Sequence, residues 1–227
     1  MKKISISILI LFVTLSASAQ YGRYNNSSAG EFRLGLTAGV NFSNLKNEDY
    51  DFSVKAGLKI GAIAEYAFND YFALSPELVF TQRGCKKEEV NSFAGMQSIS
   101  EIKWNINYIQ LPINAIVRYS INDNLKIMGF AGPYFAYALS GKKTEKGNAQ
   151  GNGISTSIDS EEEIKFGSGE KEWNPLDIGL TIGAGVEFFS FFFRFQYELG
   201  LNNLADKYTT VKNTNFGLSI GYLFRLN

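Results

Sequence analysis

Alternation of apolar and polar residues is the main pattern of the chain, and it is clearest at the C-terminus. In residues 214–227, TNFGLSIGYLFRLN, one set of alternate positions is aromatic or aliphatic, while the other is small or polar except for Leu223. A period of two indicates a β-strand, because successive side chains of a strand point to opposite faces. A strand with one continuous apolar face suits a sheet whose outer surface contacts lipid.

Seven further segments alternate in the same way, so the sequence predicts eight strands. These are residues 32–42, 54–68, 72–82, 108–119, 125–138, 176–188, 191–201 and 214–227. The segment 125–138 is apolar on both faces, which leaves its register open. Tight joints alternate with long connections at residues 43–53, 83–103, 139–173 and 202–213. Short periplasmic turns that alternate with long outer loops are typical of up-and-down outer-membrane barrels.

The two faces of the predicted strands indicate a barrel with a polar interior. Charged residues and glycines occupy the positions opposite the apolar stripes, and the stripes of the five clearest strands contain neither. A soluble sandwich of two sheets also buries one stripe per strand, so it is the alternative. We predict an all-β fold, an eight-stranded antiparallel up-and-down transmembrane β-barrel with its apolar stripes facing lipid.

Charges of both signs on the predicted inner face are interpreted as a structural network. An eight-stranded barrel is only wide enough for side chains to fill its interior. Opposite charges can pair there, which favours a filled lumen over the alternative of an open pore with a selectivity ring. The predicted lumen charge network consists of Arg33, Lys55, Lys59, Glu65, Glu77, Arg118, Glu187, Arg194 and Glu198.

Aromatic residues gather near both ends of the predicted strands, which predicts two girdles at the membrane interfaces. The group near the short turns comprises Tyr66, Phe68, Tyr71, Phe72, Tyr119, Phe188, Phe189, Phe191, Tyr222 and Phe224. The group toward the long loops comprises Phe42, Trp104, Tyr108, Tyr137, Trp173 and Phe216.

The N-terminus predicts export from the cytoplasm. Lys2 and Lys3 precede an apolar run, and Ala17-Ser18-Ala19 forms a small-residue cleavage site before Gln20. We expect residues 1–19 to be a signal peptide, 20–31 a periplasmic segment and 32–227 the outer-membrane barrel. A retained anchor helix is the alternative, which the abrupt end of the apolar run disfavours.

Charge and composition exclude several other functions. The 22 basic and 22 acidic residues balance, which argues against a nucleic-acid partner attracted by bulk charge. The chain has no histidine and one cysteine, so histidine-based catalysis and zinc sites built from His and Cys are excluded. We therefore expect no enzymatic activity, no cofactor and no metal site.

The connection 139–173 is expected to be the main functional surface, because it is long and rich in Gly, Ser and Asn. Its acidic run, residues 159–163, has the oxygen ligands that a divalent cation prefers, although a solvated acidic loop is the favoured interpretation. Cys85 falls in the long connection 83–103, where a solvent-exposed thiol could form cross-links, although a coincidental position is the favoured interpretation.

Several short motifs, in their order along nearly the whole mature chain, resemble those of a known family. The motifs are Gly35-Leu36-Thr37-Ala38-Gly39, Pro76-Glu77-Leu78, Gln82-Arg83-Gly84, Tyr108–Pro112, Gly132–Tyr134, Gly183–Glu187 and Gly221–Phe224. The chain resembles the Bacteroidetes outer-membrane β-barrel family, often called the porin or PorT family. The resemblance implies an outer-membrane barrel without implying one activity, and the founding branch is associated with type IX secretion and gliding.

These observations lead to one functional hypothesis and two alternatives. We expect a small, monomeric outer-membrane barrel in contact with lipid, with a structural or interaction role and with outer loops that bind a protein partner or ligand. A narrow diffusion channel is the first alternative, and an accessory component of a secretion machine is the second.

Overall fold

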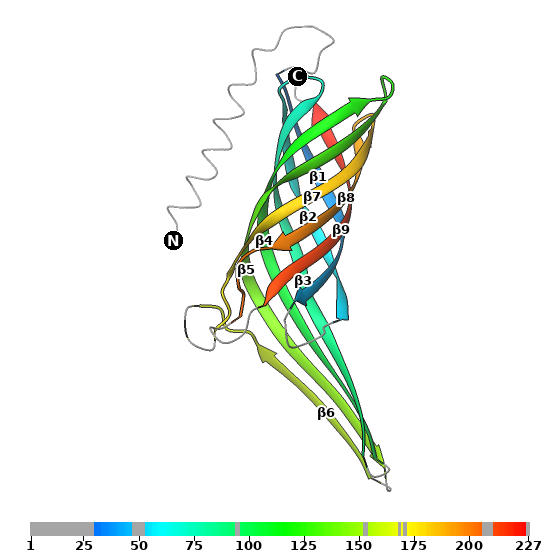
Figure 1. Ribbon diagram of the computed structural model, residues 1–227, viewed down its shortest axis with the longest axis vertical. Helices are drawn as coiled ribbons and strands as arrows, with labels where there is room; N and C mark the ends of the chain where they lie inside the picture. The colour runs from blue at the N-terminus through cyan, green and yellow to red at the C-terminus, as the bar shows by residue number, and fades with distance from the viewer. Residues whose placement is uncertain are drawn as a thin grey trace.

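The computed structural model describes residues 30–46, 53–93, 96–151, 154–167, 169, 172–205 and 211–225. These residues form nine β-strands (Figure 1). The strands are β1 Glu31–Lys46, β2 Ser53–Ala67, β3 Phe72–Phe93, β4 Met96–Ser120, β5 Leu125–Gly151, β6 Ile154–Glu163, β7 Leu176–Phe188, β8 Phe191–Gly200 and β9 Lys212–Arg225. The predicted signal peptide and residues 20–29 lie outside the described residues. In the described part of the chain, no helix is long and apolar enough to cross a membrane.

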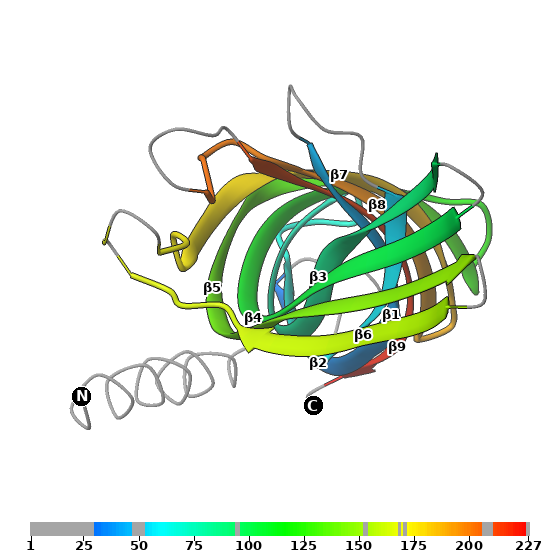
Figure 2. The same cartoon turned by 90° about the horizontal axis from the view of Figure 1, so that it is seen from below.

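Eight of the nine strands close into a ring, which confirms the predicted barrel. The strand order is β1, β2, β3, β4, β5, β7, β8 and β9, and β9 pairs with β1 to complete the circle (Figure 2). Every pairing between neighbours in the ring is antiparallel. The short turns 68–71, 121–124 and 189–190 lie at one end, together with the start of β1 and the end of β9.

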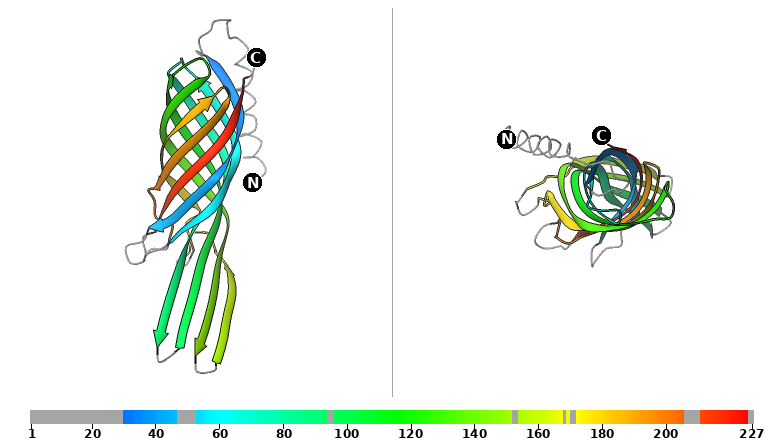
Figure 3. Two further views of the ribbon diagram at one scale, coloured as in Figure 1. Left: turned by 90° about the vertical axis from the view of Figure 1, so that its right-hand side faces the viewer. Right: turned by 90° about the horizontal axis from the view of Figure 1, so that it is seen from above.

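The prediction that residues 83–103 and 139–173 form loops is wrong over most of their length. Strands β3, β4 and β5 continue past the rim of the barrel, and β6 pairs with the far part of β5 (Figure 3). The result is a four-stranded sheet that projects from the end opposite the short turns, here called the extension. It consists of residues 86–93, 96–107, 140–151 and 154–163.

The strands change course where the extension leaves the barrel. In β5 the pairing skips Leu139, because Asn107 is opposite Ser140 while Tyr108 is opposite Ala138. An extra residue of this kind bends a strand and moves the following side chains to the other face. In β3, Gly84 has φ +151°, and a Cβ there would lie 1.9 Å from the carbonyl oxygen of Trp104. The position therefore requires glycine.

Within the barrel, side chains alternate between lipid and lumen as the sequence predicted. Strand β8 shows the pattern most clearly, since its residues are alternately exposed and buried from Phe191 to Gly200. The open register of the segment 125–138 is resolved as well, because the even-numbered residues Met128, Phe130 and Tyr134 are buried inside. Leu223, the apolar exception on the polar face of the last strand, also points inward and is fully buried in an apolar cluster.

The aromatic girdle near the short turns is exposed on the outside, whereas the second predicted girdle is only partly correct. Nine of the ten aromatic residues predicted near the short turns are exposed, from Tyr66 to Phe224. In the second group Phe42 and Tyr137 face outward, but Tyr108 is buried in the lumen. Trp104 and Trp173 pack on apolar clusters at the mouth of the barrel.

The outward stripes should be sensitive to charge according to their depth in the membrane. Ile182 is 63% exposed at the middle of β7, and Tyr119 is equally exposed beside a short turn. We expect Ile182→Arg to lower the free energy of unfolding by ~2–4 kcal/mol, and Tyr119→Arg by ~0–1 kcal/mol, because a charge at the rim reaches water. Urea unfolding in lipid vesicles measures both, and equal losses at the two positions would contradict the lipid-facing assignment.

Candidate functional site

The interior of the barrel holds a balanced set of buried charges. Among the described residues, the buried basic side chains number five and the buried acidic side chains also number five, so their formal charges sum to zero. The basic residues are Arg33, Lys59, Arg83, Arg118 and Arg194, and the acidic residues are Glu65, Glu77, Asp177, Glu187 and Glu198. Each ion has an opposite partner within 4 Å, as charges removed from water require.

The first group of ion pairs is centred on Glu65 and lies toward the short turns. Glu65 accepts hydrogen bonds from Arg33 and from Arg118, the latter at 2.5 Å. Arg33 also binds Glu187 through both of its terminal nitrogens, at 2.6 and 3.0 Å. This fork geometry fixes two carboxylates from different strands against one guanidinium. The pairs therefore join β1, β2, β4 and β7 across the lumen.

Two further cations extend this group along the barrel. Arg194 donates to Glu77 at 2.8 Å, and Lys59 lies 3.5 Å from the same carboxylate. The Arg194 guanidinium also stacks over Phe192, with 4.4 Å between its central carbon and the ring centre. A cation over an aromatic face is stabilised by the ring's electrons, so Phe192 contributes to the charge network as well as to packing.

The second group surrounds Arg83 and lies toward the extension. Arg83 binds Asp177 at 3.0 Å and Glu198 at 2.5 Å, and it also donates to Gln110. Tyr134 covers the guanidinium, with its ring centre 5.0 Å away. Side-chain amides complete the shell of the two carboxylates, with Asn213 donating to Asp177 and Asn215, Gln110 and Gln196 donating to Glu198.

Gln196 connects the two groups into one network. Its amide nitrogen donates to Glu198 at 2.7 Å, and its amide oxygen accepts from Lys59 at 3.1 Å. A chain of hydrogen bonds and ion pairs thus runs along the lumen from Glu187 to Asp177. Side chains from opposite walls of the barrel therefore bind one another over most of the length of the lumen.

The structure brings together eight of the nine residues that the sequence placed in the network. The exception is Lys55, which is half-buried at the far end of β2 and forms no ion pair with a carboxylate in the described part of the chain. Its position explains the difference, because Lys55 lies opposite Ser43 at the mouth of the barrel far from the short turns. Arg225 also had inner parity in the sequence, but it is exposed at the rim and pairs with Glu31.

Sequence reasoning missed Arg83, the centre of the second group, because it assigned this residue to a loop. The signal was present, since Arg83 continues the inward alternation of Glu77 and Thr81. Asp177 had the correct parity but was left out of the predicted set. Gln110 and Gln196 had the correct parity too, and uncharged amides give no sign in the sequence that they bridge ions.

Buried apolar side chains form three clusters, one in the short-turn half of the lumen and two at the opposite mouth. One cluster, which includes Ile63, Met128 and Phe192, shares the short-turn half of the barrel with the Glu65 group. At the other end, Ile106 and Tyr108 pack with Ile164, Phe166 and Trp173 from the segment that follows β6. A third cluster at that mouth consists of Leu45, Cys85, Leu204 and Val211, with Trp104, Trp173 and Ala205 packed against it.

The expectation of an exposed thiol at Cys85 is wrong. Cys85 is a residue of β3, its side chain points inward, and it is fully buried in the third apolar cluster. A buried thiol behaves as a small apolar side chain, and it is shielded from the reagents and partner thiols that would cross-link it.

The acidic run 159–163 belongs to β6 and faces lysines of β5. Lys142 pairs with Glu161 at 2.5 Å, and Lys146 pairs with Asp159 at 3.3 Å. The hydrogen bond from Lys142 to Glu161, together with the charge of that carboxylate, raises the pKa of Lys142. Among the described residues, no group of three or more Cys, Asp or Glu side chains is arranged to hold a metal ion. The charges therefore act as cross-strand pairs on the surface of the extension.

Comparison with solved structures finds similar barrels at low sequence identity. Ail, the attachment invasion locus protein of Yersinia pestis, is 20% identical over 86% of this chain and 99% of its own, with a TM-score of 0.42. OprG of Pseudomonas aeruginosa is 12% identical over 87% and 97%, with a TM-score of 0.43. Neisserial surface protein A is 13% identical over 84% and 97%, with a TM-score of 0.41. No curated protein matches the sequence.

Comparison with protein families gives a match over most of the chain. The outer membrane protein β-barrel domain matches residues 18–206, which include the first eight strands of the structure. The closed ring of eight antiparallel strands, with apolar residues outside and paired charges inside, has the architecture that such a domain requires. The chain belongs to the outer membrane protein β-barrel domain family.

Proposed function

We propose that this outer-membrane barrel has a filled, non-conducting lumen and that it acts by binding a partner through the extension. In this proposal the short turns face the periplasm and the extension projects outside the cell. The barrel serves as the anchor, and the role is one of interaction rather than catalysis. Export through cleavage of residues 1–19 belongs to the same proposal.

The observation that carries the proposal is the difference between the two halves of the molecule. In the barrel, charged side chains are buried and paired across the lumen. In the extension, charged side chains are exposed on a sheet whose outer strands, β3 from residue 88 onward and β6, each have one edge that pairs with no other strand among the described residues. Exposed strand edges and charged side chains can recognise another chain, whereas buried pairs cannot. The extension is thus the better candidate for a binding surface.

The network should be essential to the stability of the barrel. Glu65→Gln removes the negative charge that Arg33 and Arg118 share, and it leaves their buried positive charges underneutralised. We expect a loss of ~3–5 kcal/mol in the free energy of unfolding, the usual cost of breaking a buried pair. Glu161→Gln, at an exposed pair of the extension, should change the free energy of unfolding little. Urea unfolding in vesicles compares the two, and a loss at Glu65 as small as that at Glu161 would refute a structural role.

The purified protein should pass few or no ions in planar bilayers. The side chains that would line a pore are bound to one another by ion pairs and hydrogen bonds, and an apolar cluster covers the outer mouth. Single-channel recording tests this expectation directly. Reproducible conductance steps that change with Arg194→Gln would support the diffusion channel instead.

The binding role can be tested by shortening the extension while keeping the barrel. Lys87 lies opposite Ile102, and Thr144 lies opposite Glu161, so residues 88–101 and 145–160 can each be replaced by Asn-Gly. This dipeptide closes two-residue hairpins. We expect the shortened protein to insert into the membrane normally, but not to cross-link to the proteins that the full-length protein captures in native outer membrane. The control variant Asp123→Gly, at a short turn, should still cross-link to them. Capture of the same proteins by all three would contradict the proposal.

A further inference from the structure

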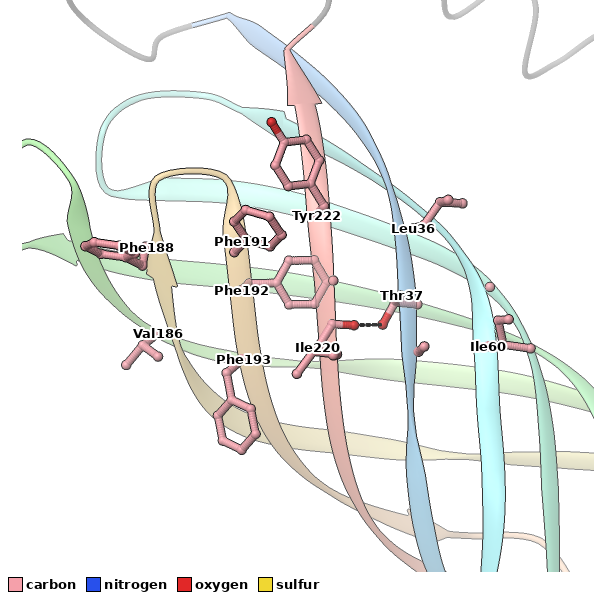
Figure 4. Close-up of a pocket in the computed structure, with 13 residues that line it drawn as sticks. Leu36, Thr37, Ile60, Val186, Phe188, Phe191, Phe192, Phe193, Ile220 and Tyr222 are labelled. Atoms are coloured by element: carbon pink, nitrogen blue, oxygen red, sulfur yellow. Dashed lines mark hydrogen bonds between the residues drawn. The ribbon is translucent and has the colours of Figure 1, made fainter.

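The lipid-facing wall carries a long apolar furrow in its short-turn half (Figure 4). Its volume is about 660 Å³, and no charged side chain lines it. Its polar side chains are those of Thr37 and Tyr222, and the Thr37 hydroxyl donates a hydrogen bond to the carbonyl oxygen of Ile220. The furrow is therefore an apolar hollow within a surface that already contacts lipid.

The strand register shows that one side of the furrow is a continuous row of outward side chains. Val186 is opposite Phe193, Phe193 is opposite Ile220, and Ile220 is opposite Ala38. Ala38 is in turn opposite Ile60 of β2. This row crosses five adjacent strands, and Ala38 has the smallest side chain in it.

A second row forms the other side and begins at the aromatic girdle. Phe188 is opposite Phe191, Phe191 is opposite Tyr222, and Tyr222 is opposite Leu36. The Phe191 and Tyr222 rings meet edge to face, with 4.7 Å between their centres. Between the two rows, the wall consists of inward-facing positions that include Gly221 and Gly61.

The dimensions of the furrow match one leaflet of a membrane. Five strands enclose four spacings of about 4.8 Å, which gives a length of ~19 Å. Because the strands of such a barrel tilt by ~45°, a row perpendicular to them climbs by about 13 Å across the membrane. Half of a hydrocarbon core is ~15 Å thick. The furrow starts beside the turn at 189–190 and ends at Ile60, seven residues before the end of β2.

We propose that the furrow binds one acyl chain of a phospholipid from the leaflet on the short-turn side. The headgroup of this phospholipid lies at the rim near Phe188 and Phe191. Its acyl chain runs past Ile220 and Ala38 toward the membrane centre. Water is excluded as an occupant, since the hollow is apolar and opens into hydrocarbon. The furrow is continuous with the lipid interface of the barrel, which favours lipid over a second copy of the chain.

Native mass spectrometry of protein extracted from phosphatidylethanolamine and phosphatidylglycerol vesicles tests the site. Ala38→Phe places a ring in the furrow, and Ala115→Phe makes the same change at an exposed, lipid-facing position of β4. We expect the wild type and Ala115→Phe to retain one phospholipid, and Ala38→Phe to retain about tenfold less, which corresponds to ~1.4 kcal/mol. Equal retention by the two variants, or none by the wild type, would overturn the proposal. If the wild type and Ala115→Phe were dimers and Ala38→Phe were a monomer, the furrow would bind a second copy of the protein and not a lipid.

A second measurement applies even if Ala38→Phe folds poorly. A phospholipid with a photoreactive diazirine near the end of one chain is incorporated into vesicles with the wild-type protein. We expect its adducts to concentrate on the peptides that contain Ala38, Ile60 and Ile220. Adducts spread evenly over all eight ring strands would contradict a defined site.

Discussion

The pairing of five basic with five acidic side chains inside a closed ring of strands is the interaction on which the rest of the structure depends. A ring in hydrocarbon cannot expose polar groups on its outer face, so its polar residues must point inward and find partners there. Partners on opposite walls, such as Arg33 with Glu187 or Arg83 with Glu198, hold those walls at a fixed separation. The network therefore constrains the shape of the barrel from inside the lumen.

The sequence predicted the barrel well because the environment imposes a strict alternation there. Each outward position of β7 or β8 must be apolar, and each inward position must be small, polar or paired, so the period of two is visible without a structure. The strand from 125 to 138 was ambiguous because its inward residues Met128 and Phe130 pack on apolar neighbours inside the lumen. An apolar inward side chain removes the contrast on which the pattern depends.

The extension could not be predicted in the same way, because most of its described residues are partly or fully exposed. Its strands need no apolar stripe, and the bulge at Leu139 shifts the alternation of β5 by one residue. Arg83 was missed for a related reason, since it is one of the last inward residues before β3 leaves the barrel and enters the extension. The acidic residues of β6 have partners 13 to 19 residues earlier in β5, a relation that only the pairing of the two strands reveals.

Two surfaces of different chemistry thus surround one interior of paired charges. The extension exposes charged side chains to water, whereas the furrow across β7, β8, β9, β1 and β2 exposes an apolar hollow to lipid. Neither surface uses a charged residue of the network, although Phe192 contacts both Arg194 and the furrow. Binding at either surface can therefore change without loss of the barrel.

Solvent exchange of the arginine side chains tests most directly whether the lumen is closed. In lipid nanodiscs, nuclear magnetic resonance can follow the guanidinium Nε–H signals after transfer to deuterated buffer. Arg33 is buried in the network, and Arg225 is exposed at the rim, so the two serve as sample and reference. The account predicts that the Arg33 signal persists long after that of Arg225 has vanished. Loss of both signals at the same rate would show that water moves freely through the lumen and would contradict the closed interior.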